Sequence, residues 1–468
     1  MKTYFFYDLE TSGLNARSAR VMQFAGIRTN MDLDPIGEPV NVLVRLSDDI
    51  LPDPYAVMVT GITPQQTLAD GISEREFCRM LMSEIFTADT TVVGFNNVRF
   101  DDEFIRHTLW RNFHDPYEWA WSDGRSRWDM LDVVRMTRSL RPEGIKWPVS
   151  EEGKPVNKLE LLAAENGLDH VKAHDALSDV EALIGVAKLI KEKQPKLFGY
   201  LFEARAKKKV AELVNLEDPR PFVYASGRYG SEHDFTTVAF PIAPGVKPGG
   251  VLVYDLRVDP EIFKNASPKA LAEIMFASRE QRQDPGFVGL PVKELSYNKC
   301  PAVAPLGVLD AAAQARIHLD LPTIDSHIKK LDAMPDFGAR IREAFEMREP
   351  YAPSVDVEDK LYDGFINDKD KGRMAAVRDA DANALADFHP DFADERLTEL
   401  LLRYKARQFP ESLSDDERKA WEIYRSQKLT SALPGYLKQL QELAAKGADT
   451  FLLEELQLWA ESIVPAED

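Results

Sequence analysis

Cysteine is scarce in this chain of 468 residues: Cys78 and Cys300 are the only two, and neither has a second cysteine at the spacing of a metal-binding pair. This scarcity excludes a disulfide-stabilised scaffold and a cysteine-rich metal centre. Long apolar runs are also missing, because no stretch approaches the roughly 18 apolar residues of a membrane span. The N-terminal apolar run ends at Asp8 and is too short for a secretory signal. The sequence therefore predicts a soluble protein of the reducing cytoplasm with no membrane partner.

Positive charge is in deficit as well. The chain has 58 Lys and Arg against 77 Asp and Glu, a net charge of −19, and residues 351–468 hold 15 basic and 25 acidic side chains. This balance argues against a protein that holds duplex DNA on a broad basic surface, but a narrow basic groove on an acidic body remains compatible with it. At roughly 150 residues per domain, the length suggests about three domains.

Residues 1–200 alternate between strand-like runs and amphipathic stretches, which is typical of an α/β domain. Gly167 is expected to close one helix at its C′ position, and Pro195 to end the last one, which predicts a domain boundary between residues 195 and 210. The predicted strands are Thr3–Tyr7, Met22–Arg28, Val42–Val44 and Thr91–Val93, and the predicted helices are Glu74–Phe86, Asp102–Asn112, Lys158–Asn166 and Asp175–Glu192.

The rest of the chain changes character twice. Short apolar runs separated by Gly and Pro turns, at Phe222–Ala225, Val238–Phe240 and Val251–Tyr254, predict a small β-rich domain with helical insertions. From Ser354 onward the strand pattern disappears, and helical periodicity predicts an all-α bundle. The predicted domains are residues 1–200, 201–350 and 351–468, and the bundle helices are Glu395–Arg407, Ser414–Gln427 and Thr450–Ile463.

Three groups of polar residues in the first domain are candidates for chemistry. Asp8 and Glu10 stand at the end of a strand, where residues i and i+2 point to the same side and can face one metal ion. Asp101 opens a predicted helix. His174 and Asp179 lie near the start of another predicted helix. Five residues correspond to a rotation of about 140°, so the two side chains could not share one face of that helix, and His174 is expected on the preceding loop or in the first turn. Each group alone also has a structural interpretation: surface carboxylates, a helix cap, or a core histidine.

Taken together, the Asp-x-Glu, the helix-start Asp and the His-x4-Asp resemble, in order and spacing, the histidine subclass of the DEDD superfamily of 3′ to 5′ exonucleases. The similarity to the bacterial exonuclease I family is closer still, and it extends to the three-part layout. It implies a ribonuclease H-like exonuclease domain with a mixed sheet, followed by an SH3-like β-rich domain and an all-α C-terminal domain. The similar stretches are Gly94–Glu103, Arg125–Asp132, Leu140–Pro148 and Asn298–Pro301.

The resemblance implies a single-strand-specific 3′ to 5′ exodeoxyribonuclease that releases 5′-mononucleotides and acts in DNA repair and recombination. It assigns Asp8, Glu10, Asp101 and Asp179 to two Mg²⁺ ions, with Mn²⁺ able to substitute, and it makes His174 the general base. Asp102 competes with its neighbour for the third position. Asp101 is preferred because Asn97-Val-Arg-Phe-Asp101 matches the Asn-x-x-Phe-Asp pattern of the family.

A single strand is held by stacking on aromatic rings and by a basic track for phosphates. Basic and aromatic side chains are interleaved after Asp101, although most of these aromatics, Trp128 especially, have a core position as the alternative interpretation. Glu10 is expected to contact substrate as well as metal, and Lys158 is placed near the 3′ end by the family pattern. The other expected DNA contacts are Arg106, Tyr117, Trp121, Arg135 and, in the SH3-like domain, Arg228 and Lys299.

The resemblance also implies a partner, the acidic C-terminal tail of the single-stranded-DNA-binding protein. A tail carboxylate calls for an arginine beside an apolar pocket, and Arg141 with Tyr200 suits this role, although Arg141 also suits a helix end or a salt bridge. A monomer is expected.

Two other functions are compatible with parts of this sequence. A 3′ to 5′ exoribonuclease or proofreading exonuclease of the same superfamily is disfavoured, because about 270 residues follow the catalytic domain. A catalytically inactive scaffold that binds single-stranded nucleic acid is disfavoured by the complete set of catalytic residue types.

Overall fold

The sheet that carries Asp8 and Glu10 is mixed. The computed structural model describes residues 1–168, 175–350 and 352–465. Strand β1 (Thr3–Thr11) lies at the centre of the sheet, antiparallel to β2 and parallel to β4, and its register on β2 shifts between Glu10 and Thr11. The mixed sheet confirms the α/β prediction for this part of the chain. The strand order is β3 (Val40–Leu43), β2 (Val21–Thr29), β1, β4 (Thr90–Gly94) and β5 (Ser126–Asp129).

The side chains of β1 alternate between two environments. Phe5, Tyr7 and Leu9 belong to a buried apolar cluster that also contains side chains of α3 (Glu74–Met80) and α4 (Asp101–Arg111). Since side chains of a strand alternate, Asp8 and Glu10 point to the opposite face. The apolar residues thus fix the strand in the core and thereby orient the two carboxylates.

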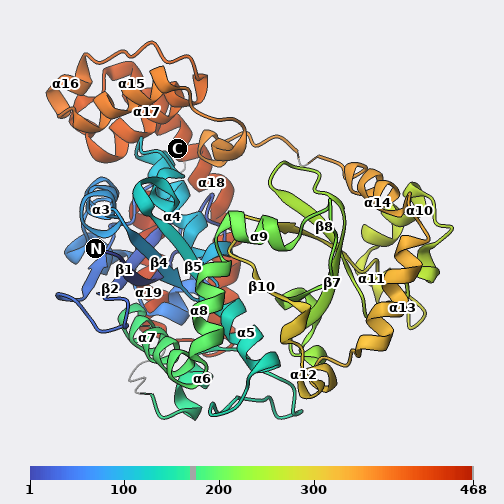
Figure 1. Ribbon diagram of the computed structural model, residues 1–468. Helices are drawn as coiled ribbons and strands as arrows, with labels where there is room; N and C mark the ends of the chain where they lie inside the picture. The colour runs from blue at the N-terminus through green and yellow to red at the C-terminus, as the bar shows by residue number, and fades with distance from the viewer. Residues whose placement is uncertain (169–174, 351, 466–468) are drawn as a thin grey trace. The chain divides into compact units, whose positions relative to one another are not determined.

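The described residues form two compact units. Residues 1–127 and 175–183 pack with residues 353–465 in the first unit, and residues 128–168 and 184–350 make up nearly all of the second. The helical tail therefore packs against the N-terminal part of the chain. Figure 1 shows the two sheets and the helices of each unit. Besides α3 and α4, the N-terminal part has α1 (Pro54–Thr60), α2 (Pro64–Asp70) and the π-helical turn η1 (Leu81–Ile85).

The second unit contains an antiparallel sheet of five strands, each joined to its neighbours by antiparallel pairing. The strand order is β10 (Ala302–Pro305), β6 (Phe222–Ala225), β7 (Thr236–Pro244), β8 (Gly250–Asp255) and β9 (Val292–Ser296). Helices α10 (Pro268–Met275) and α11 (Arg279–Arg282) are inserted between β8 and β9. The predicted β-rich domain with helical insertions is confirmed. The remaining helices here are α5 (Met130–Leu140), α6 (Leu159–Glu165), α8 (Pro195–Ala204), α9 (Lys207–Leu213), α12 (Ala311–Arg316), α13 (Leu321–Asp332) and α14 (Phe337–Glu346).

Helix boundaries follow their capping residues. Gly167 adopts the left-handed conformation after α6, and Pro195 begins α8 directly after α7 (Ala176–Lys193), as predicted. Ser414 caps α18 (Asp415–Ala445), but this helix continues past the predicted end at Gln427 and through Pro434. The other tail elements are the 3₁₀ segment η9 (Val357–Tyr362) and the helices α15 (Asp368–Asp379), α16 (Ala382–Ala386), α17 (Glu395–Gln408) and α19 (Thr450–Ile463).

No helix within residues 1–168, 175–350 and 352–465 combines the length and the apolar composition needed to cross a membrane.

Candidate active site

Three carboxylates from two elements meet in the first unit. Asp8 and Glu10 lie on β1, and Asp179 lies in the first turn of α7. One carboxylate oxygen from each residue lies within 4.8 Å of the other two, and all three residues are half-buried. The period of the strand brings the first two together, and the start of α7 adds the third. The structure thus brings together three of the four predicted metal ligands.

The electrostatics of this cluster are unfavourable without a cation. Burial, with Asp101 and Asp179 nearby, raises the pKa of Asp8 well above its usual value. Burial, followed by the charges of Asp8, Asp179 and Asp175, raises the pKa of Glu10 to about 8. The charges responsible are all carboxylates. A compact set of oxygen donors with mutual repulsion fits a hard divalent cation, which prefers oxygen ligands and would neutralise these charges.

Asp101 and Asp102 have different roles although they are adjacent at the start of α4. Asp102 is fully buried, accepts hydrogen bonds from Tyr7 Oη at 2.7 Å and from Asn97 Nδ2 at 3.3 Å, and forms an ion pair with Arg127. The charge of Asp101 instead adds to burial in raising the pKa of Asp8. Asp102 is therefore held by structural partners, and Asp101 is the one of the two whose charge acts on Asp8 of the cluster.

His174 lies outside the described residues. The chain beyond it begins at Asp175, which accepts a hydrogen bond from Ser178 Oγ at 3.0 Å, and whose main-chain carbonyl accepts one from the N–H of Asp179 at 3.1 Å. These contacts fix the first turn of α7 and hence the position of the Asp179 carboxylate. They do not show the position of the predicted general base, His174.

Aromatic side chains near α4 divide into core and surface. Trp119 is fully buried against Phe86, and Trp110 is buried as well, so for both the core interpretation holds. Trp121 is 66% exposed. Tyr117 is half-buried, with the guanidinium of Arg106 5.9 Å from its ring centre.

Two further aromatic residues, both close to Tyr117, were not predicted from the sequence. Tyr362 of η9 and Phe365, which is 91% exposed, have ring centres 6.4 and 6.2 Å from that of Tyr117. Tyr362 also donates a hydrogen bond to Glu103, which forms an ion pair with Arg106. These rings lie some 245 residues downstream of Tyr117, so no local pattern connects them; their only sequence signal is an aromatic pair in a polar linker.

The predicted DNA contacts of the second unit differ in accessibility. Lys158, Arg228 and Lys299 are exposed. Arg135 is largely buried, forms an ion pair with Asp132 at 2.6 Å, and lies over the ring of Phe235. Trp128 is buried between Phe198 and Phe202, in agreement with its core interpretation.

Arg141 and Tyr200, the predicted partner-binding residues, are both half-buried. The guanidinium of Arg141 forms an ion pair with Asp310 at 3.1 Å and donates to the main-chain carbonyls of Leu140 and Val308 at 2.6 and 3.0 Å. Burial raises the pKa of the Tyr200 hydroxyl. The carbonyl contacts hold the guanidinium in place, while its carboxylate partner Asp310 is exposed.

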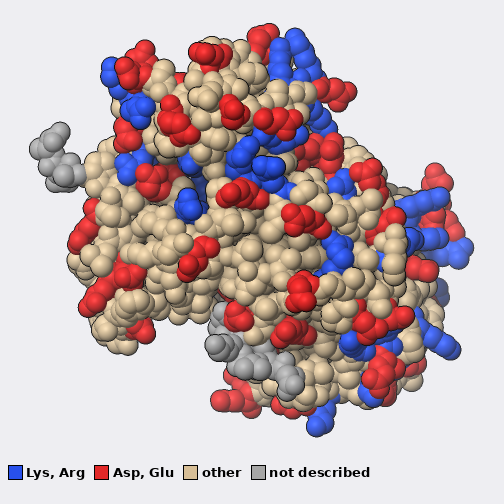
Figure 2. All heavy atoms as spheres, turned by 90° about the vertical axis from the view of Figure 1, so that its left-hand side faces the viewer, with Lys and Arg blue, Asp and Glu red and all other residues tan. Residues whose placement is uncertain are grey.

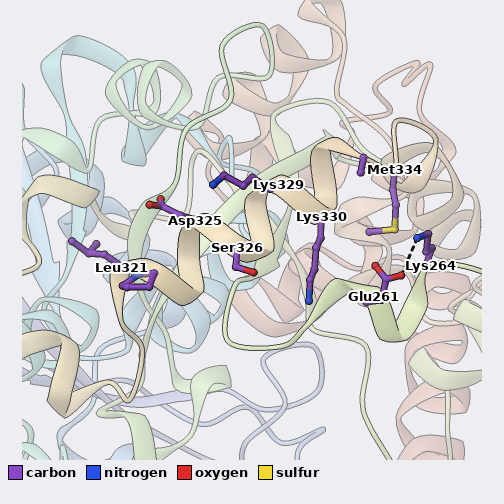
Figure 3. Close-up of a pocket in the computed structure, with 10 residues that line it drawn as sticks. Glu261, Lys264, Leu321, Asp325, Ser326, Lys329, Lys330 and Met334 are labelled. Carbon is purple, nitrogen blue, oxygen red and sulfur yellow. Dashed lines mark hydrogen bonds and ion pairs between the residues drawn. The ribbon is translucent and has the colours of Figure 1, made fainter.

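The surface charge agrees with the composition. On the face drawn in Figure 2, basic and acidic side chains are interspersed, with no broad basic field. A cavity of about 660 Å³ lies along α13 in the second unit, lined by Lys264, Glu261, Lys329 and Met334 among others (Figure 3). Lys264 and Glu261 pair with each other at 2.9 Å, and none of the clustered carboxylates lines this cavity. The carboxylate cluster therefore remains the candidate active site.

The comparisons with known proteins decide the family. Residues 5–187 match a family described as an exonuclease, residues 205–347 the exonuclease I SH3-like domain, and residues 355–463 the exonuclease I C-terminal domain. Exodeoxyribonuclease I of Haemophilus influenzae is 39% identical over 448 residues, which cover 96% of this chain and 95% of that protein. The chain belongs to the exonuclease I family.

Solved exonuclease I structures agree with this assignment. Escherichia coli exonuclease I in complex with a dA16 oligonucleotide matches with a TM-score of 0.96 at 37% identity, covering 99% of this chain and 100% of that one. The zinc-bound form of the E. coli exonuclease I complex with single-stranded DNA matches with a TM-score of 0.94 at 37% identity, covering 99% of both chains. Membership of the exonuclease I family confirms the predicted fold class and the prediction of a nuclease.

Proposed function

We propose that this protein is a single-strand-specific 3′ to 5′ exodeoxyribonuclease that releases 5′-mononucleotides. The observation that carries the proposal is the cluster of Asp8, Glu10 and Asp179, whose oxygens lie within 4.8 Å of one another. Such a cluster suits phosphodiester hydrolysis assisted by divalent cations. Two further facts support the substrate: the H. influenzae relative is named exodeoxyribonuclease I, and the matched E. coli structure contains a dA16 oligonucleotide.

Asp8, Glu10 and Asp179 are the residues that would hold the cations, and Asp101 completes the set. Two Mg²⁺ ions, replaceable by Mn²⁺, suit these oxygen donors. The raised pKa values of Asp8 and Glu10 support a cation there, since burial and, after it, the neighbouring carboxylates make both negative charges costly without a counter-ion. When bound, the cations would stabilise the negative charge that develops on the phosphodiester oxygens during hydrolysis.

His174 is proposed as the general base that takes the proton from the attacking water. An imidazole with an ordinary pKa near 6.5 suits proton transfer at neutral pH. The five-residue separation from Asp179 and the family resemblance support this assignment.

The bases of the single-stranded DNA are proposed to stack on exposed aromatic rings, and its phosphates to pair with Arg and Lys side chains. Trp121, Tyr117, Tyr362 and Phe365 supply aromatic surface in the first unit, and Arg106 lies among them. Glu10 is also proposed to contact the terminal nucleotide. Lys158, Arg228, Lys299 and Arg135 are the phosphate contacts proposed in the second unit.

The acidic C-terminal tail of a single-stranded-DNA-binding protein is the proposed partner. Arg141, held by two main-chain carbonyls, would receive the tail carboxylate beside Tyr200. A monomer that acts in DNA repair and recombination in the cytoplasm is the corresponding biological proposal.

Digestion of a 5′-labelled single-stranded DNA with Mg²⁺ or EDTA tests the proposed function. The expected result is Mg²⁺-dependent shortening from the 3′ end, lost in Asp179→Ala, with duplex DNA and RNA left intact. Preferential loss of RNA would support the exoribonuclease, and a tight complex with undigested DNA would support the inactive scaffold; either result would overturn the proposal.

A further inference from the structure

One short segment of the helical tail contacts α4, which carries Asp101, and the loop that follows β1, the strand of Asp8 and Glu10. The segment is η9, Val357–Tyr362, which packs against α4 and α17 in the first unit. Helix α4 begins with Asp101, and the loop after β1 begins two residues beyond Glu10. Both the loop and α4 form a hydrogen bond with Glu358 of η9, through Arg20 and His107 respectively.

The side chain of Glu358 holds the loop that follows β1. Arg20 Nη2 donates to Glu358 Oε2 at 2.6 Å, and both side chains are buried. The main chain of Arg20 is paired with Ser12 in two ways: Arg20 N–H donates to Ser12 Oγ, and Ser12 N–H donates to Arg20 O, both at 2.8 Å. Because Ser12 is two residues from Glu10, the ion pair fixes the loop at the end of the catalytic strand.

The main chain of η9 holds α4. His107 Nδ1 donates to the carbonyl of Glu358 at 3.2 Å, and Trp110 Nε1 donates to the carbonyl of Val357 at 3.3 Å. Burial, followed by the charge of Arg111, lowers the pKa of His107 to about 3, so this ring is neutral and its Nδ1 carries the hydrogen. Asp101 lies six residues before His107, roughly 9 Å along the helix axis.

The carboxylate of Glu358 is shared among three arginines, of which Arg403 is the most distant, with its Nη1 3.7 Å from Oε1. Besides Arg20, Arg407 Nη1 donates to Oε1 at 2.5 Å, and the same arginine also pairs with Asp49. Burial alone would raise the pKa of Glu358, but Arg407 and Arg20 hold it well below its usual range. A buried ion pair adds little net stability compared with apolar packing, yet it fixes geometry, and removing one partner leaves a buried charge unpaired.

We propose that Glu358 is a positioning residue for the candidate metal site: it fixes the loop after Glu10 through Arg20 and the helix of Asp101 through His107. The inference rests on the proposed function, since it assumes that the carboxylates bind cations. It gives the C-terminal helices a role in cation binding that is separate from any contact with DNA.

The test is direct Mn²⁺ binding to the full chain, followed by electron paramagnetic resonance and calorimetry, with Mn²⁺ alone as the probe. Glu358→Gln is expected to weaken Mn²⁺ binding about tenfold, the lower end of the effect for groups that orient metal ligands. Arg20→Lys, which keeps the charge opposite Glu358 but not the guanidinium geometry, is the milder variant if Glu358→Gln does not fold. Asp179→Ala, which lacks one of the proposed ligands, gives the level of Mn²⁺ binding outside the candidate site.

Arg75→Met is the matched control. Arg75 of α3 also joins the N-terminal part to the tail, donating to Tyr404 Oη and the Arg378 carbonyl at 3.1 Å each, but it contacts neither the loop after β1 nor α4. The positioning role is supported if Glu358→Gln and Arg75→Met both lower the thermal stability but only Glu358→Gln weakens Mn²⁺ binding. Unchanged Mn²⁺ affinity in folded Glu358→Gln or Arg20→Lys, or an equal loss in Arg75→Met, overturns it. A wild type that binds Mn²⁺ but leaves single-stranded DNA intact overturns the proposed function and leaves the positioning role standing.

Discussion

Tyr7 and Asp102, 95 residues apart, are joined by a hydrogen bond of 2.7 Å in the buried core. Tyr7 precedes Asp8, and Asp102 follows Asp101, so the bond connects the immediate neighbours of two proposed metal ligands. Burial, followed by the charges of Asp102 and Asp101, raises the pKa of Tyr7 well above its usual value, which keeps its hydroxyl protonated as the donor. The bond fixes β1 against the start of α4.

Substitution at Asp101 and Asp102 should therefore affect different properties. Asp102→Ala leaves Arg127 buried without its carboxylate and should lower the free energy of unfolding by about 3 kcal/mol. Asp101→Ala should cost less, because it also relieves the repulsion of Asp8, but should abolish Mg²⁺-dependent digestion. Urea denaturation and the digestion assay measure the two effects. Full activity in Asp101→Ala would show that Asp102 or another residue supplies the ligand.

Asp179→Asn should lower the nuclease activity and raise the thermal stability of the metal-free protein. Burial and, after it, repulsion among the carboxylates raise the pKa of Asp8 and Glu10, and removal of one charge relieves part of the repulsion. The melting temperature in EDTA should therefore rise by a few degrees, which corresponds to about 1 kcal/mol. Digestion should fall by more than about a hundredfold, beyond the usual effect of a group that only orients a ligand. Calorimetry in EDTA and then in Mg²⁺ checks the sign, because Mg²⁺ should stabilise only the wild type.

The pH dependence should follow Glu10, whose pKa is raised to about 8 in the metal-free protein. A carboxyl group with a raised pKa stabilises the fold fully below its unfolded pKa and loses this contribution as the pH rises through about 8. Glu10→Gln imitates the protonated form, so its advantage in melting temperature over the wild type should grow between pH 5 and 9 in EDTA. Wild-type Mn²⁺ affinity should rise up to about tenfold per pH unit below pH 8, since binding releases a proton. A pH-independent affinity would contradict the raised pKa.

Trp121 and Trp119 form a matched pair for DNA binding. Trp121→Ala should weaken binding of single-stranded DNA by about 1 to 3 kcal/mol with little change in melting temperature, because the ring is 66% exposed. Trp119→Ala should instead lower the free energy of unfolding by about 3 to 5 kcal/mol, because this ring fills the core against Phe86. Fluorescence anisotropy with a labelled oligonucleotide in EDTA separates binding from digestion. Unaltered affinity in Trp121→Ala would remove this ring from the proposed DNA contacts.

Asp310→Asn should strengthen the binding of an acidic tail peptide. Asp310 pairs with Arg141 at 3.1 Å and would compete with the tail carboxylate for it, whereas asparagine still caps α12 through the N–H of Ala313. The gain should be about two- to fivefold, the scale of an exposed ion pair, and Arg141→Ala should weaken binding. Peptide titration measures both. Equal affinity in Arg141→Ala and wild type would move the tail site elsewhere.

Much of the local structure could be predicted from the sequence because it depends on neighbouring residues. The two-residue period places Asp8 and Glu10 on one side of β1, and Gly167 and Pro195 end their helices as predicted. Helix α18 is longer than predicted because buried residues continue at helical spacing beyond Gln427, with Leu429 and Tyr436 on either side of Pro434. Local propensity for a break is overridden there by packing.

The remainder depends on contacts that no local pattern records. Asp101 and Asp102 look alike in the sequence, and only the partners Tyr7 and Arg127 distinguish them. Composition shows a group of tryptophans after Asp101 but cannot tell the buried Trp119 from the exposed Trp121. The bond from Arg20 to Glu358 spans 338 residues, so the packing of the tail against the N-terminal part has no signal in either segment alone.

The same separation has a consequence for synthesis. The ribosome adds about 5 to 20 residues per second, so roughly twenty seconds to a minute passes between the emergence of Arg20 and that of Glu358. In the second half of this interval the nascent chain contains Asp8, Glu10, Asp101 and Asp179, but Arg20 and His107 lack the segment that they bind in the finished protein. An unfinished chain, or one cut short before residue 357, therefore carries the acidic residues of a nuclease without the contacts that set them in place.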